Sequence, residues 1–143
     1  MPVKATKGAA AYDLYVPEDV EIKGGRQVIS LGFSMELPHG YAATIQPRSG
    51  FSARGMAIDV CGYATTIDAD VIRGLIDEDY RGNVGVIINT RDRIHYPPVI
   101  RKGTRIAQMQ IVEVPQIDLV EVNALSETSR GDGGFGHTGV NKI

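Results

Sequence analysis

The segment from Gly74 to Gly82 carries three carboxylates and one aromatic ring in four successive positions, between two stretches that read as strands. On an extended chain neighbouring side chains point to opposite sides, so Asp77 and Asp79 would share one side and Glu78 would face the other. At most two of the carboxylates can therefore converge. A carboxylate held in this way can serve as a general base, and a solvated acidic turn is the alternative interpretation.

A second segment, Pro47-Arg48-Ser49-Gly50, offers a cation, a hydroxyl group and a glycine amide in succession. Charged donors and unhindered backbone N–H groups suit phosphate oxygens, so this segment is a candidate anion site. A turn with a solvated arginine would have the same sequence. The segment Arg105-Ile106-Ala107-Gln108 is a weaker candidate, because alternation alone could put Gln108 on a solvent face.

The third candidate is a tail that places an arginine, a lone aromatic ring and a hydroxyl group on a glycine-rich chain, Arg130-Gly131-Asp132-Gly133-Gly134-Phe135-Gly136-His137-Thr138-Gly139. Such a chain could fold around a nucleotide, with Arg130 binding phosphate and Phe135 stacking. The alternatives are a flexible end without a role and an exposed Arg-Gly-Asp adhesion tripeptide. Neither alternative explains why Phe135 stands alone among glycines.

Several common kinds of site are absent from the sequence. It contains no G-x-x-x-x-G-K-S/T phosphate loop, no C-x-x-C or H-E-x-x-H metal spacing and no G-x-S-x-G elbow. The single cysteine, Cys61, can by itself form neither an internal disulfide nor a zinc site. The histidines His39, His95 and His137 are scattered, which favours turn or surface positions over metal ligands. A metal ion could still arrive with the phosphates of a substrate.

Charge and hydropathy narrow the classes of partner. The formal net charge of -2 provides no global basic field, so we expect no nucleic acid partner. No apolar run is long enough to span a bilayer, and we expect no membrane association. Residues 1–7 lack the apolar stretch of a secretory signal, so we expect a cytoplasmic protein.

Short strands are the elements expected to position the candidate residues. Apolar residues alternate with small or polar ones over residues 31–37 and 84–88, and signals rich in glycine and proline separate such runs. Glycine is abundant, at 17 of 143 residues, which indicates many tight turns. No helical pattern persists over three turns. The pattern predicts one all-β domain, a barrel or jelly roll.

Two stretches interrupt this rhythm. Residues 56–73 are long for a hairpin connection, and we predict a loop there. Residues 126–143 have little to bury apart from Phe135, and we predict a mobile arm. The expected organisation is therefore a β domain over residues 1–125, with a long loop at about 56–73, and a flexible C-terminal lid over residues 126–143.

Taken together and in this order, five segments resemble the five motifs of the trimeric dUTPase family. They are Ala10-Ala11-Tyr12-Asp13-Leu14, Pro47-Arg48-Ser49-Gly50, Gly74-Leu75-Ile76-Asp77-Glu78-Asp79-Tyr80-Arg81-Gly82, Arg105-Ile106-Ala107-Gln108 and the glycine-rich tail. The resemblance covers nearly the whole chain. It implies a distorted jelly-roll β-barrel subunit, a homotrimer whose active sites are each built from three chains, and Mg²⁺-dependent hydrolysis of dUTP to dUMP and pyrophosphate. That reaction limits uracil incorporation into DNA and supplies dUMP for dTMP synthesis.

The resemblance also implies roles for individual residues. Asp77 would deprotonate the water that attacks the α-phosphorus. Tyr80 would pack under the deoxyribose and leave no room for a 2′-hydroxyl. The main chain around Gly74 and Ile76 would pair with the uracil edge, which rejects cytosine by leaving polar atoms unpaired.

Residues from several motifs would bind the triphosphate. Ser49 and Gly50 would contact the oxygens around the α,β bridge, and Gln108 would bind farther along the chain of phosphates. Arg48 would steady this subsite across the subunit interface. Asp13 would lie near the water shell of the Mg²⁺ or brace the site, with no direct protein ligand to the metal.

The tail of another subunit would close over the bound nucleotide. In that arrangement Phe135 lies over the uracil and Arg130 binds the γ-phosphate. Gly136, His137 and Thr138 complete the contacts.

Two departures from the family pattern and two alternative functions accompany this interpretation. Ala11 stands where many members have glycine, and the connection from Gly50 to Gly74 is longer than usual. One alternative is a dCTP deaminase-like or bifunctional enzyme on the same fold, which needs a further acid/base group near the pyrimidine 4-position. The other is a nucleotide-sensing regulatory protein that uses residues 56–73 to bind a partner. The segment 77–82 favours the hydrolase.

Overall fold

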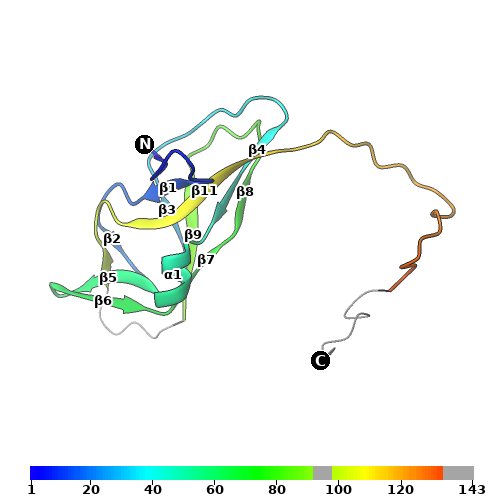
Figure 1. The fold of residues 1–143 in the computed structure, drawn as a ribbon. Coiled ribbons are helices and arrows are strands. Elements are labelled where there is room, and N and C mark those ends of the chain that lie inside the picture. The colour runs from blue at the N-terminus through cyan, green and yellow to red at the C-terminus, as the bar shows by residue number, and fades with distance from the viewer. Residues whose placement is uncertain (92–97, 134–143) are drawn as a thin grey trace.

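The computed structural model describes residues 1–91 and 98–133, and within them the chain is almost entirely β-structure (Figure 1). The elements are β1 (Tyr12–Tyr15), β2 (Val20–Glu21), β3 (Gly25–Ser30), β4 (Tyr41–Gln46), α1 (Ser49–Arg54), β5 (Met56–Val60), β6 (Tyr63–Ile67), β7 (Ala69–Ile72), β8 (Gly74–Ile76), β9 (Gly85–Thr90), β10 (Val99–Ile100) and β11 (Arg105–Glu113). The described part contains no helix long and apolar enough to cross a membrane. The all-β class predicted from alternation is confirmed.

The described strands form three sheets, with the strand orders β1-β11-β4-β8, β2-β10-β5-β6 and β3-β9-β7. The strands pair antiparallel throughout these sheets. Ile106, Ile100 and Ile88 come one from each sheet, and all three are fully buried in a single apolar cluster. The predicted barrel is open: within the described residues, no ladder joins the three sheets into a closed ring.

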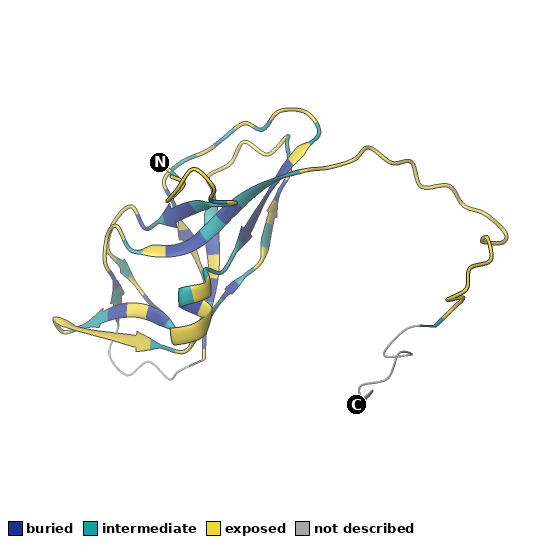
Figure 2. Cartoon of the chain, viewed as in Figure 1, coloured by how far each residue is buried: buried dark blue, intermediate teal, exposed yellow. Residues whose placement is uncertain are grey.

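Alternation along the strands builds this core (Figure 2). On β9, Val86 and Ile88 are buried, whereas Ile87 between them is exposed. Successive residues of a strand point to opposite faces, so this pattern puts one face of the strand in the core. Each large aliphatic side chain that is fully buried contributes roughly 1.5–3 kcal/mol.

Residues 31–37, predicted as a strand, form an extended connection between β3 and β4 instead. Leu31 and Phe33 each make one backbone hydrogen bond with Val84, but no continuous ladder follows. Gly32 has a positive φ of 72°, which turns the chain away from a regular strand. The alternate side chains still pack on the core, because an extended backbone keeps a period of two whether or not it is paired.

Residues 56–73, predicted as a loop, form a hairpin and a further strand. Strands β5 and β6 pair across a tight turn at Cys61 and Gly62, both of which have positive φ. A two-residue hairpin turn of type I′ has positive φ at both central residues, a conformation that glycine adopts freely and cysteine rarely does. The side chain of Asp59 closes the turn by accepting a bond from the Gly62 N–H at 2.8 Å. The additional length of this segment is therefore an extra hairpin.

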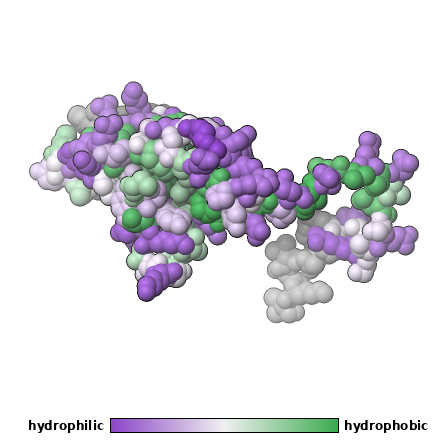
Figure 3. Space-filling model, turned by 90° about the horizontal axis from the view of Figure 1, so that it is seen from above, coloured by the Kyte–Doolittle hydropathy of each residue, from purple (hydrophilic) through white to green (hydrophobic). Residues whose placement is uncertain are grey.

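After β11 the chain leaves the sheets, and residues 114–132 are exposed almost throughout (Figure 1). Large apolar side chains on this segment face solvent, including Ile117, Leu119, Val120 and Leu125. Figure 3 shows hydrophobic surface along the arm. The predicted boundary at residue 125 lies inside this segment, beyond the last strand at Glu113. The mobility of the arm stays a prediction.

Candidate active site

Two clefts contain most of the candidate residues that the structure describes. The first, which we call the hairpin cleft, encloses about 290 Å³ and is lined by Val28, Ile45, Ile72, Gly74, Leu75, Ile76, Asp77, Tyr80, Asn83, Val84, Gly85 and Ile87. The second, the arginine cleft, encloses about 360 Å³ and is lined by Ala5, Ala9, Ala10, Ala11, Asp13, Gln46, Arg48, Ser49 and Gln108.

The hairpin cleft lies where two strands separate at Arg73, and residues of β3, β4 and β9 complete its walls. Strand β7 pairs with β9 in one sheet, whereas β8 pairs with β4 in another. Both β7 and β8 stand at the edge of their described sheets, so each has main-chain groups on its outer side that no described strand pairs. Free N–H and C=O groups therefore border this cleft, as the hypothesis of base recognition through the main chain requires.

A tight turn carries Asp77 and Tyr80 at the mouth of the hairpin cleft. Strand β8 ends at Ile76, and the Tyr80 N–H then donates to the Asp77 carbonyl at 3.2 Å. Because the chain turns here, it no longer alternates as an extended strand does, and Asp79 does not line the cleft with Asp77. The segment is a turn and not an extended strand, so the premise that placed Asp77 and Asp79 on one side does not apply.

Gly82 determines how the Tyr80 ring lies. The Tyr80 hydroxyl donates to the Asn83 carbonyl at 3.1 Å, and Tyr80, which lines the cleft, is 47% exposed. A Cβ atom at position 82 would stand 2.3 Å from the Tyr80 hydroxyl oxygen, which no pair of atoms tolerates. Glycine at 82 thus leaves room for the ring to fold back over the turn.

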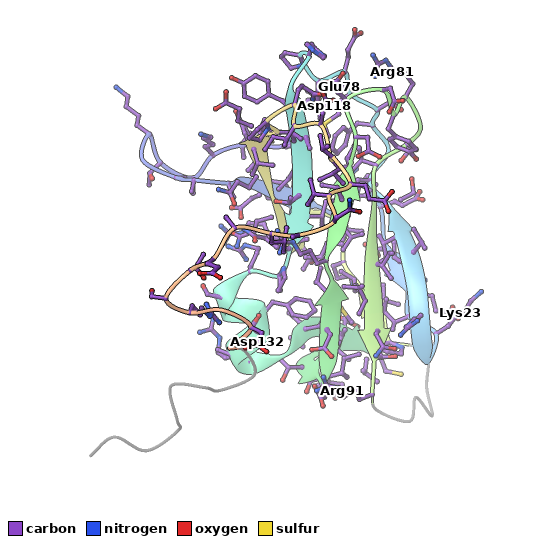
Figure 4. The ribbon with its side chains drawn as sticks, turned by 90° about the vertical axis from the view of Figure 1, so that its right-hand side faces the viewer. Lys23, Glu78, Arg81, Arg91, Asp118 and Asp132 are labelled. Atoms are coloured by element: carbon purple, nitrogen blue, oxygen red, sulfur yellow. The ribbon has the colours of Figure 1, made fainter. Side chains whose placement is uncertain are left out.

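Glu78 points away from the cleft and holds a neighbouring turn. Its two carboxylate oxygens contact His39 Nδ1 at 2.8 Å and the Gly40 N–H at 2.6 Å. A carboxylate can only accept hydrogen bonds, so Nδ1 of His39 carries the proton in this pair. The bond from His39, and then the bond from Gly40, hold the pKa of the Glu78 carboxyl below its ordinary value. Figure 4 shows Glu78 and Arg81 at the end of the molecule opposite Arg91.

The arginine cleft is built across three neighbouring strands. Asp13 on β1 is the register partner of Gln108 on β11, which is the partner of Gln46 on β4. The Gln108 amide donates to the Pro47 carbonyl at 2.9 Å, at the point where the chain leaves β4 for α1. Gln108 therefore lines the cleft, and the alternative of a purely solvent-facing side chain is excluded.

Asp13 is a buried carboxylate, 8% exposed, between two guanidinium groups. One oxygen accepts from Arg48 Nε at 2.9 Å and the other from an Arg105 terminal nitrogen at 3.3 Å. A buried charge needs such partners, because leaving water is costly for it. The two arginines and one carboxylate leave a local excess of one positive charge at the edge of the cleft.

Ser49, Gly50 and Arg130 differ in where the structure places them. Ser49 lines the arginine cleft, and Gly50 follows it in the first turn of α1. Arg130 lies on the exposed arm, where it donates to the Gly133 carbonyl at 2.7 Å, and it lines neither cleft. The predicted binding residues Phe135, Gly136, His137 and Thr138 lie outside the described residues.

Sequence reasoning missed four contributors to these clefts. They are Arg105 as a partner of Asp13, Asn83 as the acceptor from Tyr80, and the apolar walls Val28 and Ile87. Val28 and Ile87 are direct register partners on β3 and β9. Only the exposure of apolar side chains on one sheet face marks them, and exposure is not visible in a sequence.

The two clefts share no lining residue, and neighbouring residues of β4 divide between them. Ile45 lines the hairpin cleft, whereas Gln46 lines the arginine cleft. Successive strand residues point to opposite faces, so β4 separates the two clefts. Within one chain, Asp77 therefore lies in the hairpin cleft and Arg48 in the separate arginine cleft.

A protein-family model for dUTPase matches residues 1–139. The chain belongs to the dUTPase family. It is 42% identical to the deoxyuridine 5'-triphosphate nucleotidohydrolase of Hydrogenobaculum sp., over 98% of this chain and 90% of that protein. The enzyme of the same name from Paramecium bursaria Chlorella virus 1 is 38% identical, over 97% of this chain and 89% of that protein.

Solved dUTPase structures share the fold of this family member. A mutant dUTPase of Staphylococcus bacteriophage 80alpha, solved with dUpNHpp, superposes with a TM-score of 0.79 at 26% identity, over 98% of this chain and 92% of that one. A mutant dUTPase of phage phi11, described with a structural Mg(II) ion, has a TM-score of 0.72 at 22% identity, over 89% and 92% of the two chains, and supports the fold alone. The jelly-roll-like fold predicted from the resemblance is confirmed.

Proposed function

We propose that this protein hydrolyses dUTP to dUMP and pyrophosphate, with Asp77 activating the water that attacks the α-phosphorus. The observation that carries the proposal is the position of Asp77, whose exposed carboxylate borders a cleft with Tyr80 and Gly74 in a chain of the dUTPase family. A carboxylate at the mouth of a cleft can take a proton from a bound water without a large change in the fold.

The hairpin cleft is suited to a deoxynucleoside. Its walls are largely apolar, and the exposed Tyr80 ring offers a surface against which a sugar can pack. A Cβ atom at Gly74 would meet Ile45 at 3.6 Å, an ordinary contact, so packing alone does not demand glycine there. A ligand that approaches the main chain of β8 does demand it. Unpaired main-chain groups on β8 then select uracil over cytosine by matching its donors and acceptors.

The arginine cleft is suited to the triphosphate. Arg48 and Ser49 supply a charged donor and a hydroxyl group, and Gln108 lies across the same sheet. Asp13 orients Arg48 through Nε, which leaves the terminal nitrogens of the guanidinium available for phosphate oxygens. The contribution of these residues is orientation and stabilisation of the charge that develops on the leaving pyrophosphate.

A homotrimer brings the two kinds of cleft together. One chain presents Asp77 and the phosphate-binding residues in separate clefts, yet the reaction requires them around one nucleotide. We propose that the hairpin cleft of one subunit faces the arginine cleft of a neighbour. The apolar side chains of Ile117, Leu119 and Leu125 support a further contact, because such a segment gains stability by lying on another chain.

We propose that Mg²⁺ reaches the site with the triphosphate. The described residues contain no group of three His, Cys, Asp or Glu side chains that could hold a metal ion. Asp13 fits an outer role, because each carboxylate oxygen already accepts from an arginine and retains a lone pair for a metal-bound water. When bound, the ion supplies neutralisation of phosphate charge.

The C-terminal arm closes the site in this proposal. Phe135 covers the uracil, while Arg130 binds the γ-phosphate and Gly136, His137 and Thr138 complete the enclosure. Closure excludes water and commits the substrate to reaction. Deletion of the residues after Ser129 should therefore lower turnover while leaving the thermal unfolding temperature nearly unchanged, because the last described strand ends at Glu113.

One assay tests the function against its alternatives. The purified protein is incubated with each of the four common dNTPs or with dUTP in the presence of Mg²⁺, and pyrophosphate and ammonia are both measured. Pyrophosphate from dUTP alone is the expected result. Ammonia from dCTP would establish the deaminase instead, and nucleotide binding without either product would establish a sensor.

A further inference from the structure

Glu78 has no part in the proposed reaction, yet it ties the turn that carries Asp77 to a distant segment. Its carboxylate accepts from His39 and from the backbone of Gly40, residues that precede Glu78 by almost 40 positions. The side chain is 37% exposed, whereas His39 is 81% exposed. An exposed ion pair contributes little, so the partly buried bond to the Gly40 N–H is the stronger constraint.

The position of this contact matters because the backbone ladder stops just before it. Strand β8 pairs with β4 up to the pair Ile76 and Ala43. Beyond Ile76 the chain enters the turn, and the antiparallel partner strand begins at Tyr41. The Glu78 carboxylate reaches the residue that precedes this strand. A side chain therefore continues the connection between the two strands where the main chain no longer does.

The turn at His39 and Gly40, which Glu78 contacts, is stabilised by two backbone hydrogen bonds. The Tyr41 N–H donates to the Pro38 carbonyl at 3.2 Å and closes a turn around His39 and Gly40. The Gly40 carbonyl also accepts from the Val114 N–H at 2.8 Å, next to the end of β11. Gly40 has a φ of 81°, which glycine adopts without strain. These hydrogen bonds hold the turn in place at the end of sheet β1-β11-β4-β8.

We propose that Glu78 is a positioning residue, which sets the orientation of Asp77 and Tyr80 by fastening their turn to Gly40. This inference rests on the proposed function. Arg81 also supports the turn, through bonds from its guanidinium to the Glu78 and Tyr80 carbonyls at 2.6 and 3.2 Å. Those bonds do not involve the Glu78 carboxylate, so its loss loosens the turn without unfolding it.

The proposal predicts that Glu78→Ala lowers kcat about tenfold, since a small displacement of a reacting group costs this much or more. KM should rise by less than kcat falls, because the Tyr80 hydroxyl keeps its bond to the Asn83 carbonyl and the main chain of β8 and the arginine cleft stay in place. Glu78→Gln keeps an oxygen that can accept from the Gly40 N–H, and it should recover most of kcat. His39→Ala removes the exposed contact and should lower kcat less than Glu78→Ala does.

The measurements are steady-state hydrolysis of dUTP and thermal unfolding, with Glu18→Ala as the matched control. Glu18 is an exposed glutamate between β1 and β2. Unchanged kcat in Glu78→Ala, or equal losses in Glu78→Ala and Glu78→Gln, would overturn the positioning role. If Glu78→Ala does not fold, Glu78→Asp replaces it, because its shorter carboxylate keeps the charge but loses the reach. Full kcat in Glu78→Asp then overturns the inference.

The outcome also separates this inference from the function on which it rests. A wild-type protein that releases no pyrophosphate from dUTP overturns the proposed function, and the positioning role with it. An active wild-type protein whose Glu78→Ala variant keeps its kcat overturns the positioning role alone.

Discussion

The hairpin cleft and the arginine cleft are built on different principles. The hairpin cleft owes its shape to main chain: two edge strands that part at Arg73, and a tight turn that ends in Gly82. The arginine cleft owes its shape to side chains that cross strands, with buried Asp13 between Arg48 and Arg105. In the first, the proposed general base, Asp77, is exposed. In the second, Arg48, which we propose binds phosphate, is also a partner of the buried Asp13 carboxylate.

This difference predicts separate consequences of mutation. Substitution of Asp77 should lower the turnover of dUTP without changing the free energy of unfolding. Substitution of Asp13 should change both the kinetics and the free energy of unfolding. The following experiments test this difference between the two clefts, in order of decreasing expected effect.

Asp77→Asn should lower the turnover of dUTP by roughly 10²–10⁴, the range for loss of a general base. The free energy of unfolding should stay the same, because the side chain is exposed. Pyrophosphate release and urea denaturation measure the two quantities. A variant with normal turnover would show that another group activates the water.

Asp13→Ala should lower the free energy of unfolding by about 2 kcal/mol, since it removes charge-assisted hydrogen bonds from two arginines. The loss of stability is limited because the Arg105 side chain is 47% exposed, so its guanidinium can form hydrogen bonds with water instead. KM for dUTP should also rise as Arg48 loses its orientation. Urea denaturation and steady-state kinetics test both effects. A stable variant with a normal KM would remove the distinction between the clefts.

Gly82→Ala should weaken substrate binding through Tyr80. The new methyl group would overlap the Tyr80 hydroxyl, so the ring must leave its place over the turn. We expect KM to rise by about 5- to 12-fold, equivalent to the loss of roughly 1–1.5 kcal/mol of ring contact. Gly24→Ala is the control, because a Cβ atom there meets nothing within 4 Å. Equal KM values in the two variants would contradict the role of Gly82.

The smallest effect concerns stability at acid pH. The Gly62 N–H, and then Arg101, hold the pKa of Asp59 below its ordinary 3.8, and His39 followed by Gly40 holds that of Glu78 below 4.5. A folded pKa below the unfolded value gives stability that is present above these ordinary values and is lost as pH falls through the lowered ones. The urea midpoint should therefore begin to drop as pH falls toward 4.5 and should keep dropping below 3.8.

The variant Asp59→Asn should show a smaller drop over the same interval, because its side chain no longer titrates. Glu18→Gln, an exposed control, should behave as the wild type does. An identical drop in Asp59→Asn and the wild type would mean that the Asp59 hairpin does not contribute to the acid sensitivity.

The sequence located the parts of the site that are local in the chain. Asp77, Tyr80 and Gly82 lie within six positions, and their residue types indicate a tight acidic turn. Arg48 and Ser49 form a similarly compact signal, and both line one cleft. Such patterns are readable because a turn is determined by its own few residues.

Two predictions of local structure were wrong for a related reason. Residues 31–37 alternate as a strand does, yet no neighbouring strand pairs with them continuously. Residues 56–73 were predicted to form a loop. In the structure, however, β5 pairs with β6 and β10, and β7 pairs with β9. A β-strand forms only where another segment pairs with it through backbone hydrogen bonds. The residues of one segment do not show which other segment will be its partner.

The all-β class, the family, and the residue types of the acidic turn and the arginine segment could be predicted from the sequence, because they depend on short-range pattern. Which distant groups come into contact depends on the fold of the whole chain. Asp13 and Arg105 are separated by 92 positions, and Glu78 and Gly40 by 38. Strand register brings each pair together, and register is set by the packing of the whole core, which no single segment specifies.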